Sequence, residues 1–209
     1  DNFSSDGKYL CYDTRETIGV GIDHGTTIEL LELSTGREIV IYKPDEIVTG
    51  EEPAPGVGAV SFNFAVPEVA FIHGPPVSEV AERGPYGKPN RNGGCVTLDG
   101  EIVEKAGRWH MLTDAEYNFS WIDKRDIATD RDTLPGAHRG GTHRHEYSRD
   151  GRRIGFTYDD FLLPEYDRTV GYMEANIAAP APASHYFAVI VPVVPKGTSK
   201  PGEIEKAFG

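Results

Sequence analysis

The residues best suited to chemistry form a run of histidines and arginines between Ala137 and His145. Three of the seven histidines of the chain fall within eight residues here, at positions 138, 143 and 145. His143 and His145 are two residues apart, a spacing that on a strand puts both side chains on one face of a sheet. Because neutral imidazole is a common ligand of first-row metals, the pair predicts a divalent-metal site. The alternative is two structural histidines with ordinary hydrogen bonds.

Positive charge is concentrated in the same stretch. The five arginines from His138 to Arg153 are at positions 139, 144, 149, 152 and 153. Arginine binds carboxylates through two parallel hydrogen bonds, so we expect an acidic oligosaccharide or another small anionic ligand. Arg139 is the best catalytic candidate, because the Gly-Gly that follows lets the backbone approach a ligand. The three arginines at 149, 152 and 153 are expected to be solvated and to pair with acidic residues.

Two further histidines lie at the ends of apolar segments. His73 follows the apolar residues 69–72 and precedes a Gly-Pro-Pro sequence, so it either faces a ligand as a catalytic residue or caps a loop. His185 begins the apolar segment 186–191 and is either a metal ligand or a buried structural histidine. Trp121 either stacks on a sugar ring or anchors its loop.

Composition excludes several classes of function. Lys and Arg number 21 and Asp and Glu 33, giving a net charge of −12, whereas a nucleic-acid binder needs clustered positive charge. No apolar run approaches the roughly 20 residues of a membrane-spanning helix. The two cysteines, Cys11 and Cys95, lie in no CxxC motif and are expected to be reduced and buried. We expect a cytoplasmic protein, with a periplasmic location as the alternative.

An internal repeat supplies the elements that must position these residues. The aromatic-Ser-x-Asp-Gly sequence at 3–7, followed by an apolar strand, recurs at 147–151, and Asp-Gly suits a tight turn between strands. Residues 66–73 resemble a third copy and residues 184–191 a fourth. A predicted hairpin, 27–33 and 37–42, follows the first copy.

Strand pairs followed by hairpins at regular intervals are typical of β-propeller blades. The sequence therefore predicts an all-β chain, residues 1–209, that forms part of a single β-propeller with TolB/WD40-like blades. The blade-like units are expected near 1–42, 60–110, 143–175 and 184–209. Three or four units are fewer than most closed propellers contain, so we expect an incomplete propeller in which a second chain or further sequence completes the ring. Residues 74–94 and 113–141 are predicted to be long loops.

Several of these segments resemble a bacterial family of TolB-like propellers of unknown function. The resemblance covers most of the chain, and its most specific part is the Arg-Gly-Gly-Thr-His-Arg-His sequence at 139–145. Residues 71–75, 156–160 and 202–207 also match the family. Members of that family are longer than this chain, which agrees with an incomplete propeller.

Residues 142–157 are also similar to oligogalacturonate lyase, a seven-bladed propeller. The resemblance implies that His143 and His145 are ligands of a divalent metal ion, with Mn²⁺ the usual ion, and that His185 or His73 supplies a further ligand or the base. The lyase has a Gln ligand where this sequence has Gly140. The implied reaction is β-elimination on a uronate, in which the metal neutralises the carboxylate, a histidine removes the proton, and Arg139 stabilises the developing charge.

Two functions therefore remain open. One is a metal-dependent enzyme that acts on an acidic saccharide, and the other is a non-catalytic propeller that binds a glycan or a protein partner through its loops. Propellers do both, so the fold cannot decide between them. The feature that separates them is whether His143 and His145 converge with a third ligand on one face of the sheet.

Overall fold

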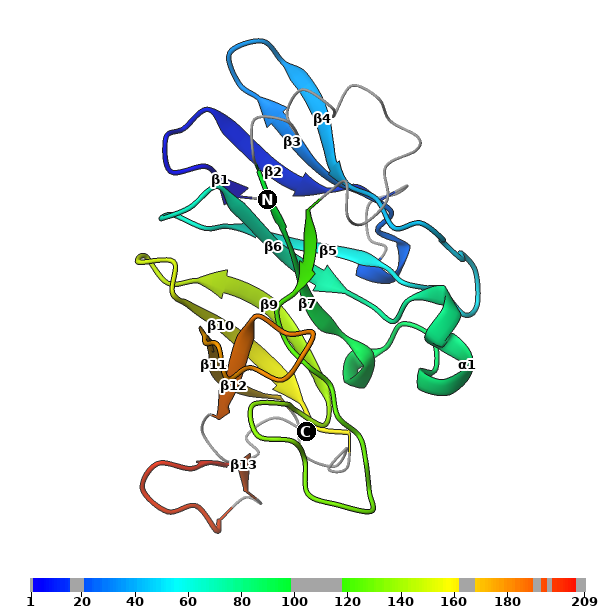
Figure 1. Cartoon of the computed structure of the whole chain (residues 1–209), viewed down its shortest axis with the longest axis vertical. Helices are drawn as coiled ribbons and strands as arrows, with labels where there is room; N and C mark the ends of the chain where they lie inside the picture. The colour runs from blue at the N-terminus through cyan, green and yellow to red at the C-terminus, as the bar shows by residue number, and fades with distance from the viewer. Residues whose placement is uncertain are drawn as a thin grey trace.

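The computed structural model describes residues 2–15, 21–98, 118–161, 168–189, 193–194 and 197–205. These residues form three four-stranded antiparallel sheets and one two-stranded parallel sheet. The three large sheets succeed one another from the N-terminal, blue part of Figure 1 to the yellow and orange part. The fold is thus all-β and consistent with an incomplete β-propeller, as the sequence predicts, and the described residues contain three blades.

Each blade is a meander in which strands that follow one another in sequence are neighbours in the sheet. The first blade contains β1 (Asn2–Phe3), β2 (Tyr9–Asp13), β3 (Ile28–Glu32) and β4 (Arg37–Tyr42). The second contains β5 (Val57–Phe62), β6 (Glu68–His73), β7 (Asn92–Thr97) and β8 (Phe119–Trp121). The third contains β9 (Gly141–Tyr147), β10 (Arg153–Asp159), β11 (Thr169–Ala175) and β12 (His185–Val189). The parallel sheet pairs β13 (Val193–Val194) with β14 (Ile204–Glu205).

The predicted units differ from the observed blades mainly at their boundaries. The second blade extends from β5 to β8, and residues 99–117 within it lie outside the described residues. Residues 185–189, which we expected to open a fourth unit, form β12, the outer strand of the third sheet, where they pair with β11. The predicted loop 74–94 contains two 3-10 helices, Val77–Glu79 and Lys88–Asn90, and a short helix α1 (Val80–Arg83).

Two apolar cores join the blades. The first lies between blades one and two and includes Ile28, Leu30 and Tyr42 on one side and Val69 and Phe71 on the other. The second lies between blades two and three, where Ile122 meets Ile154, Phe156, Met173 and Phe187. Because apolar area removed from water stabilises folding by about 25 cal/mol per Å², the contacts between blades hold the incomplete ring together. Both cysteines are buried and free, as predicted.

The two Asp-Gly copies fold into the same turn. Asp6 accepts hydrogen bonds from the Ser4 hydroxyl (2.7 Å) and the Lys8 amide (3.1 Å), and Asp150 accepts the equivalent bonds from Ser148 (2.6 Å) and Arg152 (3.2 Å). The sequence repeat therefore marks the link between the first and second strands of a blade. In the second blade Asn63 occupies the corresponding loop, and its side chain donates to the Gly151 carbonyl at 3.3 Å.

This turn generates a matched pair of substitutions. Gly7 and Gly151 have φ values of 69° and 70°, so alanine at either position is strained by roughly 1–2 kcal/mol. A Cβ at Gly7 meets no atom within 4 Å, whereas one at Gly151 lies 2.2 Å from Asn63 Oδ1 and 2.8 Å from Ala65 Cβ. We expect Gly151→Ala to lower the free energy of unfolding by about 1–3 kcal/mol more than Gly7→Ala, measured by urea denaturation. Equal effects would show that the third blade does not pack on the second at this turn.

Candidate functional site

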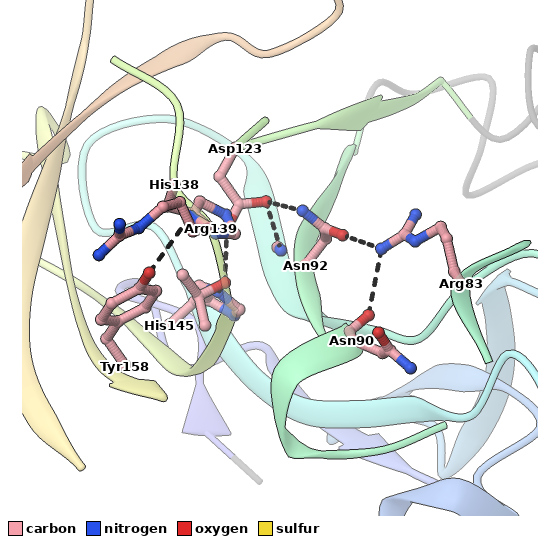
Figure 2. A network of polar contacts seen from close by, with 10 residues as sticks. Arg83, Asn90, Asn92, Asp123, His138, Arg139, His145 and Tyr158 are labelled. Carbon is pink, nitrogen blue, oxygen red and sulfur yellow. Dashed lines mark hydrogen bonds and ion pairs between the residues drawn. The ribbon is translucent and has the colours of Figure 1, made fainter. Parts of the chain in front are cut away.

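A buried carboxylate, Asp123, is the centre of the candidate site (Figure 2). Strand β8 ends at Trp121, and the next amide, that of Ile122, donates to the Gly93 carbonyl at 2.8 Å. Ile122 is fully buried in the core between blades two and three. This anchoring places Asp123 inside the protein, where it is only 2 % exposed.

Asp123 accepts hydrogen bonds from both neighbouring blades. Its Oδ1 accepts from the Asn92 side chain and from the Gly93 amide, each at 2.9 Å. Its Oδ2 accepts from the Thr142 hydroxyl of β9. His138 Nε2 lies 3.1 Å from the same oxygen, but without the alignment of a full hydrogen bond. A carboxylate offers about four acceptor positions, and three of them are filled by these hydrogen bonds.

Charge on Asp123 is stabilised by this environment. Burial alone would raise the pKa of Asp123, but the neighbouring His138, together with His145 and Thr142, holds that pKa well below its usual range. The carboxylate is therefore ionised at neutral pH. Because an isolated buried charge is costly, the hydrogen-bond donors of Asn92, Gly93 and Thr142 are required for it to remain inside the protein.

His145 is fixed against the same network. Since the Thr142 hydroxyl donates to Asp123, its oxygen is free to accept from His145 Nε2, 2.9 Å away. This leaves Nδ1 of His145 without a proton, and that buried atom has no hydrogen-bond partner. Burial lowers the pKa of His145 to about 4, so the imidazole is neutral. A Cβ on residue 93 would lie 3.0 Å from His145 Nε2, which explains why glycine stands there.

The network continues outward to the surface of the second blade. Arg83, the last residue of α1, donates to Asn92 Oδ1 at 2.6 Å and to the Asn90 carbonyl at 3.2 Å. Its other terminal nitrogen forms an ion pair with Glu79 at 2.7 Å. Arg83, Asn92 and Asp123 all line one pocket of about 250 Å³. The buried network therefore forms the polar inner wall of a cavity.

A β-bulge separates the two histidines that the sequence predicts on one face. Glu146 pairs with Gly155 and His143 pairs with Thr157, so Arg144 and His145 together stand opposite the single residue Phe156. Arg144 adopts a positive φ of 62° to form this bulge. The extra residue turns His145 toward the core with Thr142, while His143 lies on the opposite face. The prediction of one shared face was wrong, because period-two alternation fails across a bulge.

The remaining predicted residues are distributed over separate environments. Arg139 forms an ion pair with Asp160 at 2.9 Å, beside Tyr158. His185 is buried, its Nδ1 lies 2.8 Å from the Ser184 hydroxyl, and burial lowers its pKa, against the effect of Asp123. His143 lies among arginines, and burial followed by Arg91 and Arg168 lowers its pKa to about 3.

His73 lies in a different pocket, at the end of β6. Its Nδ1 donates to the Gly74 carbonyl at 2.6 Å, so its Nε2 accepts the proton of the Tyr42 hydroxyl at 2.9 Å. Both ring nitrogens are therefore engaged. Of the predicted set, His145 and His185 lie close enough to Asp123 for its charge to influence the pKa of each.

The donors do not fit the divalent ion that the lyase resemblance implies. His143 is on the wrong face, and the oxygens of Asp123 are occupied by hydrogen-bond donors. Within the described ranges, no three His, Cys, Asp or Glu side chains are arranged to hold a metal ion.

The fold and site define a propeller segment whose blades two and three are joined by a buried Asp-His network. The chain belongs to the family described as "Protein of unknown function (DUF3748)", whose model matches residues 56–192. It is similar to the uncharacterized protein YidR of Escherichia coli (strain K12), with 27 % identity over 221 residues that cover 99 % of this chain and 45 % of the relative. The chain thus spans less than half the length of this relative.

Two solved structures are also similar. TolB from Acinetobacter baumannii is 12 % identical, with a TM-score of 0.33, and the match covers 91 % of this chain and 43 % of TolB. The tricorn protease is 7 % identical, with a TM-score of 0.40, and the match covers 83 % of this chain and 17 % of the protease. None of the helices in the described part of the chain is long and apolar enough to span a membrane.

The Asp123 network predicts a large loss of stability on removal of one charge. Both oxygens of Asp123 accept hydrogen bonds, so in Asp123→Asn the new NH₂ group must point at another hydrogen-bond donor. The substitution also removes the negative charge beside His138. We expect the free energy of unfolding to fall by about 3 kcal/mol, measured by urea denaturation. The control is Asp132→Asn, an exposed position expected to change stability by less than about 0.5 kcal/mol. A parent-like midpoint for Asp123→Asn would contradict the network.

His73 predicts a pH dependence of stability. Burial, its largest influence, lowers the pKa of His73 to about 4 from 6.5, so the unfolded chain binds a proton that the folded chain does not between these pH values. Stability therefore falls as pH decreases through this window. The slope of the unfolding free energy against pH measures how many more protons the unfolded chain binds. Between pH 6.5 and 5 we expect His73→Gln to reduce this number by up to about one. Tyr42→Phe is the control, because it removes the same hydrogen bond but keeps the buried imidazole; an equal slope change in both variants would refute the assignment.

Proposed function

We propose that this propeller segment is a non-catalytic binding module for a small acidic saccharide. The proposed site is the cavity of about 250 Å³ at the end of the Asp123 network, between α1 and the segment that follows β8. One observation carries the proposal: Arg125 lines the cavity, and its buried Nε has no hydrogen-bond partner among the described residues.

The buried guanidinium of Arg125 favours an anion in this cavity. Burial, and after it the nearby Arg83, lowers the pKa of Arg125 to about 10, because two guanidinium groups lie near each other in a partly dry place. Of the three acidic lining residues, Glu79 is already paired with Arg83, Asp123 is already surrounded by donors, and Glu82 is exposed to solvent. A carboxylate that accepts two hydrogen bonds from Arg125 would compensate this charge, and Lys124 lines the same cavity.

The rest of the cavity wall suits a sugar ring. Trp121, Ile127 and Pro182 provide apolar surface, while Asn92 provides a polar group already oriented by Asp123. Binding sites commonly combine such apolar walls with a few fixed polar groups. A uronate offers both features, since its ring has an apolar face and its carboxylate is anionic.

Binding fits the positions of the candidate residues better than metal-dependent β-elimination does. The lyase resemblance requires His143 and His145 to share a metal, and the bulge at Arg144 places them on opposite faces. Arg139, the expected stabiliser of the developing charge, is held by Asp160. Binding requires none of these residues to converge.

The binding proposal predicts charge-dependent affinity. In isothermal titration calorimetry we expect galacturonate to bind and its neutral counterpart, galactose, to bind at least about tenfold more weakly, because a charge-assisted hydrogen bond contributes about 1.5–3 kcal/mol. Arg125→Gln is expected to weaken galacturonate binding by about tenfold or more. Arg149→Gln is the charge-matched control, since Arg149 is exposed on a turn of the third blade and does not line this cavity.

Two results would overturn the proposal. Equal affinities for galacturonate and galactose, or unchanged binding by Arg125→Gln, would exclude recognition of the acid at this site. Formation of an unsaturated uronate from oligogalacturonate in the presence of Mn²⁺ would favour the lyase instead.

A further inference from the structure

A groove lies where the turns that link the first two strands of each blade come together. In the third blade this turn packs closely on the second blade, and a Cβ on Gly151 would lie 2.2 Å from Asn63 Oδ1. In the equivalent turn of the first blade, a Cβ on Gly7 meets no atom within 4 Å. The space left between the first two blades is a groove of about 390 Å³, lined on one side by residues 4–6 and on the other by residues 62–67.

Exposed apolar side chains form the accessible wall of this groove. Phe64 is 44 % exposed and Val66 is 51 % exposed, and both line the groove together with the half-buried Tyr9 and Leu98. Deeper lining residues, such as Leu30, belong to the core between the blades. Contiguous apolar surface that remains open to solvent commonly marks a binding site.

The groove continues toward the third blade, where it reaches a positive charge. Ser4, Ser5 and Phe64 also line a wider hollow of about 890 Å³, and the remaining lining residues of that hollow include Phe3 and Arg149. Phe3 is 57 % exposed, so it extends the apolar wall. Among the described residues that line this hollow, Arg149 is the one with a charge.

The Arg149 guanidinium is available to an anion. Among the described residues it forms no ion pair, whereas the arginines at 152 and 153 lie 4.0 and 3.3 Å from Glu174. The acidic groups nearby are already engaged. Asp6, which lines the groove, pairs with Lys8 at 3.1 Å, and Asp150 accepts the hydrogen bonds of its own turn. The groove therefore combines an uncharged apolar wall with one available cation at its end.

We propose that this groove binds a linear amphiphile with one anionic end, namely a free medium-chain carboxylate. Its alkyl chain lies on Phe64 and Val66, and its carboxylate accepts hydrogen bonds from Arg149. Removal of apolar surface from water supplies most of the affinity, and the exposed ion pair adds a smaller contribution. The groove shares no lining residue with the acidic-saccharide cavity, so the two proposals stand separately.

Octanoate tests the proposal, with butyrate and 1-octanol as probes that each lack one half of the pattern. In isothermal titration calorimetry with the whole chain we expect octanoate to bind at least about tenfold more tightly than butyrate, because its additional methylene groups leave water. We expect it to bind about threefold more tightly than 1-octanol, because only octanoate pairs with Arg149. Equal binding of octanoate and butyrate, or displacement of octanoate by galacturonate, would overturn the proposal.

One pair of double variants locates the alkyl chain. Phe64→Ser/Val66→Ser removes two exposed apolar side chains, and we expect it to weaken octanoate binding by about tenfold. The matched control is Leu33→Ser/Val48→Ser, which changes residues that are 45 % and 41 % exposed and do not line the groove or the hollow. It should bind octanoate like the parent. Equal weakening by both double variants would contradict the assignment.

A second pair of variants locates the carboxylate. Arg149→Gln is expected to abolish the threefold preference for octanoate over 1-octanol while leaving the affinity for 1-octanol unchanged. Arg152→Gln is the control, because Arg152 is exposed on the same turn but does not line the groove or the hollow, and it should keep the preference. A preference that survives in Arg149→Gln would show that the carboxylate does not bind there.

Discussion

The buried charge of Asp123 is the constraint on which the site depends. A carboxylate with almost no exposure is tolerated only where donors surround it, and here those donors come from two blades: Asn92 and Gly93 from the second, Thr142 from the third. The same contacts orient Asn92, which in turn receives Arg83. One charge therefore joins two blades and also sets the inner wall of the cavity at the surface.

Much of the fold follows from local sequence. The two Asp-Gly copies fix equivalent turns through the same side-chain hydrogen bonds, and the alternation of apolar residues identifies most strands. These signals are local, which is why the sequence alone predicts blades. The pairing of β12 with β11 is different, because it depends on which sheet has an unpaired edge strand nearby in space. A local sequence pattern does not contain that information.

The site was harder to predict for the same reason. His145 and its run of arginines were recognisable as unusual, but Asp123 was not, because a single aspartate after Trp-Ile carries no motif. Its importance arises from residues 30 positions earlier and 19 positions later in the chain. The bulge at Arg144 is equally absent from the sequence pattern. Because of it, the residues of β9 before the bulge lie on the opposite face from the one that regular alternation would give them. A His-x-His spacing is thus informative about chemistry only once the register is known.

Trp121 lines both the cavity beside Asp123 and the pocket that contains His73, and this has a thermodynamic consequence. If a ligand in one pocket changes the position or mobility of the indole ring, the affinity of the other pocket changes by some factor, and linkage requires that the effect in the reverse direction be the same. Packing of Trp121 against His73 and Phe119 limits how far the ring can move, so the sign and size of this coupling are set by the aromatic cluster. The cluster therefore controls how strongly the two pockets influence each other.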